Sequence, residues 1–468
     1  MQVIKKVSGA SKLDILYLMF VVMSGIFWQE RIINQDNALF AFNITAFESF
    51  ELAHYRFTDI FSQIIPILLV KAGLDLQTIL SCYSILLVLL PYLLFRIVLY
   101  TFSDKGMAWM LFLAQILFVS DYFFDAISES KGAIALSLFC IAILKNKIVF
   151  KHIYFYYGLG IIALTFALFT HPVSLVLIAI LLLWSYVNKL MEKKYTYLFF
   201  GLIAVVSILK YFFFPTSGYE NGMINEVLDV SKWAEVLKEN YVLTFISSQF
   251  RKIYLFGFLF LLLFFFRYIR YGKTKTALLY LALNMGMFFL LLITFKQGDS
   301  NMMMEKNLST LAVTILLPFI GKEADSLNVF NSFRVRFFLP FLCLFLLHRI
   351  NKASAFYTER QNTLNKWIEI GKDYGHQKYL INQEALSNTP EISIWSLPYE
   401  TALISTLKYP ENSMTIKNIK EVEYWRGLHN HKDAFIGADF FMPYNTKKIK
   451  SNLYNFGEEK YYLLEINK

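Results

Sequence analysis

Acidic and basic side chains that could carry out chemistry are concentrated just after the first long apolar segment. Asp36 follows the end of that segment by a few residues, and His54 and Arg56 come later in the same polar stretch. A carboxylate in a partly dry cleft can exchange protons near neutral pH, because loss of water raises its pKa. Arginine suits phosphate, because its planar guanidinium offers paired N–H donors. These residue types can accept a proton and hold an anion if the fold brings them together.

The composition indicates that a membrane positions these residues. Of the 468 residues, 56% are hydrophobic and only 17% are charged, whereas soluble domains are roughly one-quarter charged. One soluble core could not hide so much apolar surface, so the surplus is expected to face lipid. Apolar runs follow one another up to residue 350, which predicts a transmembrane domain over 1–350. The mixed, polar remainder predicts a small α+β soluble domain over 351–468, which begins with an amphipathic helix over 351–375 that continues from the last span.

The apolar runs predict an all-α polytopic fold with about eleven transmembrane helices, since a helix needs about 20 apolar residues to cross the hydrocarbon core. The run at 59–73 is a special case, because it contains Asp59, Gln63, Lys71 and Pro66. The predicted spans are 13–30, 76–101, 106–123, 128–145, 153–170, 172–188, 195–214, 252–268, 276–295, 307–321 and 332–350.

Loop charges set the predicted orientation. If 59–73 lies flat as an interfacial helix in the first outer loop, the strongly basic loops all fall on the side of the basic N-terminus, as the positive-inside rule requires. This predicts a cytoplasmic N-terminus and an extracytoplasmic C-terminal domain, which in a bacterium indicates the inner membrane. The basic loop residues are Lys145, Lys147, Lys151, Lys189, Lys193, Lys194, Arg267, Arg270, Lys273 and Lys275.

The first outer loop resembles that of a known enzyme superfamily. It contains Asp36 near the end of the first span, and later the stretch HYRFTDIFSQIIPILLVKAGLDL, which is basic, contains a proline and ends in a glycine turn. This order is similar to the GT-C superfamily of membrane glycosyltransferases, which includes aminoarabinose transferases and protein O-mannosyltransferases. The usual second acidic residue of the family is replaced by Asn37. No cofactor is certain: this replacement weakens the case for a divalent metal, which stays possible, and no metal ligands are assigned.

The resemblance implies an inverting transfer of a sugar from a polyprenyl-phosphate donor to a glycan, lipid or protein acceptor on the extracytoplasmic face. It implies Asp36 as the catalytic base and Arg56 as the first candidate for binding the donor phosphate, because the lipid phosphate leaves as an anion. His54, Lys131 and Lys296 are weaker phosphate candidates. The expected substrate-pocket residues are Asp121, Asp125, Glu129, His171 and Glu305.

Each assignment has a structural alternative. Asp36 could be a solvated acid or a helix cap, Arg56 a snorkelling anchor and His171 a helix cap before Pro172. Glu129 could simply pair with Lys131. The protein could instead be an O-antigen or exopolysaccharide polymerase, a membrane transporter or lipid flippase, or a non-catalytic scaffold. The net charge of +10 is spread through short loops, so no nucleic-acid partner is expected.

Overall fold

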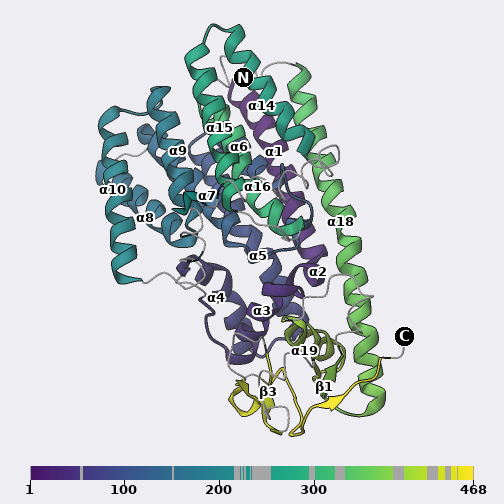
Figure 1. Ribbon diagram of the computed structural model, residues 1–468. Coiled ribbons are helices and arrows are strands. Elements are labelled where there is room, and N and C mark those ends of the chain that lie inside the picture. Colours follow the sequence, from purple (N-terminus) through teal and green to yellow (C-terminus); the bar gives the residue numbers. More distant parts are fainter. Residues whose placement is uncertain are drawn as a thin grey trace.

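The computed structural model describes residues 2–52, 56–149, 152–214, 222, 225, 228–231, 233, 254–294, 301–321, 333–382, 395–418, 431–437, 444–450 and 452–466. Within these ranges the chain is mostly helical (Figure 1). The helices of the first half are α1 (Gln2–Ile26), α2 (Trp28–Ile32), α3 (Gln35–Phe47), α4 (Ile60–Lys71), α5 (Leu76–Arg96), α6 (Lys105–Ile116), α7 (Glu129–Lys145), α8 (Ile153–Thr170), α9 (Val173–Val187) and α10 (Lys193–Phe213). The later helices are α14 (Leu255–Arg270), α15 (Thr274–Thr294), α16 (Asn301–Ile315), α18 (Phe333–Tyr374) and α19 (Leu397–Lys408).

Among the described residues, four helices are long and apolar enough to cross a membrane. They are Leu76–Thr101, which is α5 with a π-helical extension, and then α8, α10 and α15. Every predicted span falls largely on a helix, and 153–170 has the bounds of α8. A helical membrane protein is therefore supported, whereas the number of eleven crossings stays a prediction.

The helices differ in how much of their surface the protein itself covers. All twelve side chains from Ala133 to Leu144 of α7 are buried, and so is most of α6, so these helices form the centre of the bundle. Helix α10 instead exposes large apolar side chains, among them Ile208, Leu209 and Phe212. Exposed apolar surface of this extent fits contact with lipid.

Helix α4 covers most of the run 59–73 and is too short to cross a membrane alone. Its twelve residues extend about 18 Å, against about 30 Å for the hydrocarbon core. Phe61, Ile64, Ile65 and Leu68 are exposed at helical spacing, which gives the helix one apolar outer face. This geometry fits the predicted interfacial helix, whose position in the bilayer stays a prediction.

The C-terminal part packs on the first loop, at the end of the bundle away from the N-terminus (Figure 1). Helix α18 has 42 residues and extends about 63 Å from the bundle to this end, so it continues unbroken across the predicted boundary at residue 350. The ring of Phe42 in α3 stacks 4.7 Å from Phe435 and contacts Tyr454 at 5.0 Å. The tail and α3 therefore share one apolar core.

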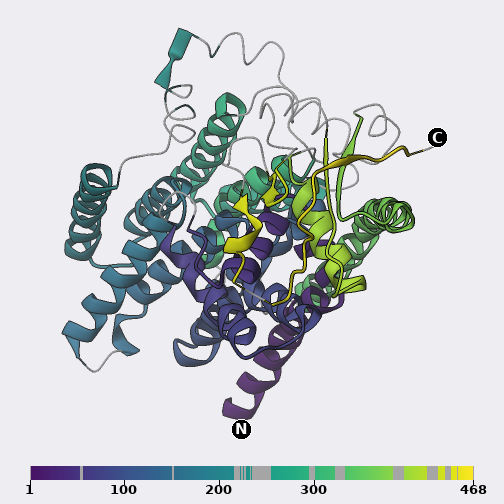
Figure 2. The same cartoon turned by 90° about the horizontal axis from the view of Figure 1, so that it is seen from below.

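The tail contains a small parallel sheet with the order β2-β1-β5. Strands β1 (Lys378–Ile381) and β2 (Thr415–Asn418) are connected through α19 and pair in parallel, with Lys378 opposite Thr415. The third strand is β5 (Tyr462–Leu463), and a separate antiparallel pair is formed by β3 (Ala434–Phe435) and β4 (Tyr444–Asn445). Seen from below, these strands lie over the lower helices (Figure 2).

Candidate functional site

Asn37 joins the first loop to the segment between α6 and α7. Its side-chain amide donates to the carbonyl of Phe124 at 3.0 Å, and its side-chain oxygen accepts from the backbone N–H of Ile127 at 2.8 Å. Asn37 is 1% exposed, so both hydrogen bonds are shielded from water. Asn37, which stands where the GT-C resemblance predicts a second acidic residue, thus holds the 121–131 segment against the start of α3.

Asp36 lies in the first turn of α3 beside this joint. It makes no capping hydrogen bond, since the N-cap of α3 is Asn34, so the helix-cap interpretation is wrong. The side chain is open to solvent, yet the surrounding protein removes enough hydration to raise its pKa to about 6, and Asp125 adds to this rise. We refer to Asp36 and the charged groups that act on it, which are Asp125, Arg56, Glu129 and Lys306, as the Asp36 recess.

Arg56 and Glu129 form an ion pair whose side chains are 9% and 10% exposed. Lys306 approaches the second oxygen of Glu129 at 3.9 Å. Lys131 was the alternative partner expected for Glu129, but the structure pairs this carboxylate with Arg56 and Lys306 instead. Arg56 is also too buried, at 7%, for a snorkelling interface anchor.

His171 lies near the same charges and is electrically neutral. Burial, together with the nearby charge of Lys306, lowers its pKa to about 3. Its Nδ1 accepts a hydrogen bond from the backbone N–H of Val173 at 3.1 Å, at the start of α9. A neutral imidazole that accepts at Nδ1 carries its proton on Nε2. His171 precedes the N-cap Pro172, accepts a hydrogen bond from the start of α9 and keeps one donor at Nε2, and its place in a substrate pocket stays a prediction.

A small cavity adjoins Glu129 and has both polar and apolar walls. Its polar lining includes Thr58, Asp59 and Ser128, and its apolar lining comes from α5 and α7, with Leu90 and Leu136 among them. Burial and the nearby charge of Glu129 hold the pKa of Asp59 well above its usual range. Buried oxygens of Thr58 and Asp59 have no hydrogen-bond partner among the described residues.

Lys131 also lines this cavity, but its ammonium is engaged by the backbone. Its Nζ donates to the carbonyls of Tyr122 and Asp125 at 2.6 and 2.7 Å, and lies 4.2 Å from the centre of the Tyr122 ring. These contacts stabilise the turn that carries Asp125. Its role in phosphate binding stays a prediction.

Asp121 and Glu305 belong to a neighbouring group that includes Arg349. One carboxylate oxygen of Glu305 accepts the backbone N–H groups of Ser120 and Tyr122 at 2.6 and 2.9 Å. Glu305 is fully buried and electrostatically linked to Asp121 and Arg349. Glu305 thus orders the segment that carries Asp121.

Sequence reasoning missed Lys306 and gave Asp59 no catalytic or binding role. Lys306 follows Glu305 directly, but apolar patterning alone did not show which of these two neighbours faces Glu129. Asp59 stood in the proposed interfacial helix and was treated only as a topology signal. The phosphate candidates His54 and Lys296 lie outside the described residues.

The arrangement combines an accessible carboxyl whose pKa is near neutrality with two cations and a cavity that is apolar on one side. Such a set can accept a proton at Asp36 and hold an anion near Arg56 and Lys306. Within the described ranges, no three His, Cys, Asp or Glu side chains are grouped as a metal site. Comparisons with family models, curated proteins and solved structures give no match to this chain.

Proposed function

We propose that the chain is a membrane glycosyltransferase similar to the GT-C superfamily, which transfers a sugar from a polyprenyl-phosphate donor to an acceptor outside the cell. The observation that carries this proposal is the geometry that brings two cations to the segment beside Asp36. Asn37 binds the backbone of Phe124 and Ile127, and Glu129 of the same segment pairs with Arg56 and Lys306. A base and an anion-binding group within reach of each other are what the transfer requires.

The chemistry assigns a role to each part of the recess. An acceptor hydroxyl attacks the anomeric carbon and forms the new C–O bond, while its proton passes to the Asp36 carboxylate. The bond from that carbon to the phosphate oxygen breaks at the same time, and its electron pair leaves with the lipid phosphate. Arg56 and Lys306 stabilise the negative charge that develops on this leaving group.

The cavity beside Glu129 suits a donor carried by lipid. Its polar end adjoins the ion pair of Arg56 and Glu129, and its apolar wall lies along α5 and α7. The exposed apolar face of α4 lies next to this region, since α4 packs on α5. A phosphate headgroup could bind at the polar end while its chain extends toward the bilayer.

The location of the recess supports an outer-face reaction. Helix α3 and the tail lie together at the end of the bundle away from the N-terminus (Figure 1). With the N-terminus assigned to the cytoplasm by the positive-inside rule, this end is extracytoplasmic. In a bacterium, the protein would then act at the outer face of the inner membrane on a glycan, lipid or protein acceptor.

A deletion strain tests the proposal. Envelope glycolipids and glycoproteins are compared by mass spectrometry among the parent, the deletion strain and strains complemented with the wild type or with Asp36→Asn. We expect one glycoconjugate to lose a single sugar in the deletion strain, to regain it with the wild type and to remain incomplete with Asp36→Asn. An unchanged set of glycoconjugates, or full rescue by Asp36→Asn, would overturn the proposal.

A further inference from the structure

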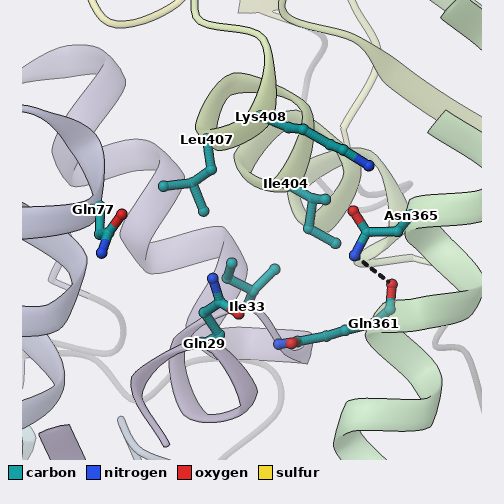
Figure 3. A pocket seen from close by; sticks show the side chains of 8 residues that line it. All are labelled: Gln29, Ile33, Gln77, Gln361, Asn365, Ile404, Leu407 and Lys408. Atoms are coloured by element: carbon teal, nitrogen blue, oxygen red, sulfur yellow. Dashed lines mark hydrogen bonds between the residues drawn. The ribbon is translucent and has the colours of Figure 1, made fainter. Parts of the chain in front are cut away.

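A second cavity of about 250 Å³ lies between the first loop and the tail (Figure 3). It is bounded by α2, α5, α18 and α19, so residues more than 300 positions apart in the sequence form its walls. The volume is near the lower end of small-molecule sites, which are about 300 to 1,000 Å³. A cavity of this size suits one ring of a larger ligand.

Carboxamides dominate the polar lining. Gln29, Gln77, Gln361 and Asn365 come from three helices, and none of the described residues that line the cavity is acidic. Lys408 is the one cation among these lining residues, and its ammonium forms an ion pair with Glu369. The cavity therefore has almost no net charge, while amides can both donate and accept hydrogen bonds. One donor of the Asn365 amide is engaged by the backbone carbonyl of Gln361 at 3.0 Å (Figure 3). This chemistry suits a neutral ligand with several hydroxyl groups.

Gln361 is the strongest sign that the cavity was built for a ligand. The residue is 7% exposed, and its side-chain Nε2 is buried without a hydrogen-bond partner among the described residues. Figure 3 shows this side chain extending from α18 into the cavity. A buried donor without a partner destabilises the protein, so a ligand oxygen that accepts from it binds more favourably.

Apolar side chains lie among the amides (Figure 3). Ile33 lies beside Gln29, and Ile404 and Leu407 come from α19. A pyranose carries both hydroxyl groups and C–H faces, so it can contact amides and aliphatic side chains in one cavity. A neutral ligand without hydroxyls would leave the amides unpaired.

The cavity is connected to the start of α3. Ile33 lies in its wall, and the next residue, Asn34, accepts a hydrogen bond from Arg360 at 2.5 Å. Arg360 immediately precedes Gln361. A ligand in the cavity would therefore sit on the tail side of the same short segment that leads to Asp36.

We propose that this cavity binds a neutral pyranose unit of the acceptor. Its assignment to the acceptor rests on the proposed function, but the binding of a neutral pyranoside does not. The C-terminal tail would then form part of the acceptor-binding site, in addition to packing on the transmembrane helices.

Saturation-transfer NMR on the full chain in lipid nanodiscs tests the proposal. The probes are the methyl glycosides of glucose, galactose, mannose and N-acetylglucosamine, with inorganic phosphate as a competing anion. We expect at least one glycoside to bind the wild type, and phosphate not to displace it. Gln361→Leu should weaken that binding about tenfold, because the ligand loses the hydrogen bond from the side-chain amide. The unfolding temperature should not fall, because the substitution also removes a buried donor that has no partner in the free protein.

Two control variants locate the binding. Asn362→Ala alters an exposed neighbour on α18, and Asp36→Asn alters the proposed base; both should leave glycoside binding unchanged. Absence of binding, displacement by phosphate, or equal binding by Gln361→Leu would overturn the site. Loss of binding in Asp36→Asn would move the glycoside to the recess and also overturn it. Binding needs no turnover, so failure here is distinct from failure of the transferase proposal.

Discussion

The side-chain oxygen of Asn37 accepts a hydrogen bond from the backbone N–H of Ile127 at 2.8 Å, across 90 positions of sequence. The same side chain donates to the carbonyl of Phe124. An aspartate at this position would keep the acceptor but lose the donor. The amide is therefore required for the joint that holds the 121–131 segment beside Asp36.

Asn37→Asp should lower stability and reduce transfer. The variant leaves the Phe124 carbonyl without its donor and adds a carboxylate near Asp36 and Asp125, which should cost about 1 to 3 kcal/mol. Unfolding temperature in detergent measures this effect. Asn362→Asp, on the exposed face of α18, is the matched control and should change little. Equal stability of the two variants would show that the Asn37 hydrogen bonds do not hold the segment.

The ion pair of Arg56 and Glu129 should show strong coupling. Arg56→Met leaves a buried carboxylate with only Lys306 beside it, and we expect a loss of about 3 kcal/mol. Arg56→Met combined with Glu129→Leu should lose less, because no uncompensated charge remains. Denaturant unfolding of both single variants and the double variant measures the coupling. Strictly additive losses would contradict a direct pair.

Lys306 should assist transfer and tune the base. Its positive charge lowers the pKa of Asp36, opposing the increase that burial causes. In Lys306→Met that pKa should rise above about 6, so the acid limb of the activity profile should move to higher pH. The maximal rate should also fall by at least about tenfold, since one leaving-group cation is lost.

The matched control for Lys306 is Lys366→Met on the exposed surface of α18. It should leave both the rate and the pH profile unchanged. A Lys306→Met enzyme with the wild-type profile would show that this ammonium does not act on Asp36.

Arg360 and Glu400 should couple the tail to the first loop. Their ion pair is 2% and 0% exposed, and Glu400 also accepts the backbone N–H of Gln35 at 3.0 Å. Arg360→Met or Glu400→Gln alone should cost about 3 to 5 kcal/mol, because each leaves a buried charge uncompensated. The double variant should be more stable than either single variant. The exposed pair of Lys447 and Glu458 provides a control, worth about 0 to 1 kcal/mol.

Proteolysis gives a second test of this connection. A broken pair should free the tail from α3, so proteolytic cleavage after residue 374 should become faster in Arg360→Met than in Lys447→Met. Equal cleavage rates would contradict the structural link between the tail and Asp36.

Helix positions could be predicted from the sequence, since long apolar runs have a direct physical cause. The spans 76–101 and 153–170 match helical segments with the same bounds. The grouping of Asp36, Arg56 and the 121–131 segment followed from assigning all three to one face. Their functional roles stay predictions.

Contacts between distant segments could not be predicted in this way. The helix over 351–375 that continues the last span was predicted, but hydropathy does not show that this second half of α18 packs on the tail. Nor does it show which of Glu305 and Lys306 faces Glu129, since this depends on the rotation of α16. Asn37 was interpreted only as the replacement of an expected acid. Its hydrogen bonds could not be predicted, because their backbone partners are about 90 residues away in the sequence.

The pH dependence of sugar transfer by the wild type and by Asp36→Asn tests the central claim most directly. A general base acts only when it is deprotonated, so the wild-type kcat/KM should be low in acid and rise with an apparent pKa of about 6. Asp36→Asn should fold normally but lose this rise, with transfer reduced by at least about a hundredfold. An Asp36→Asn enzyme that keeps both the rate and the acid limb would contradict the account.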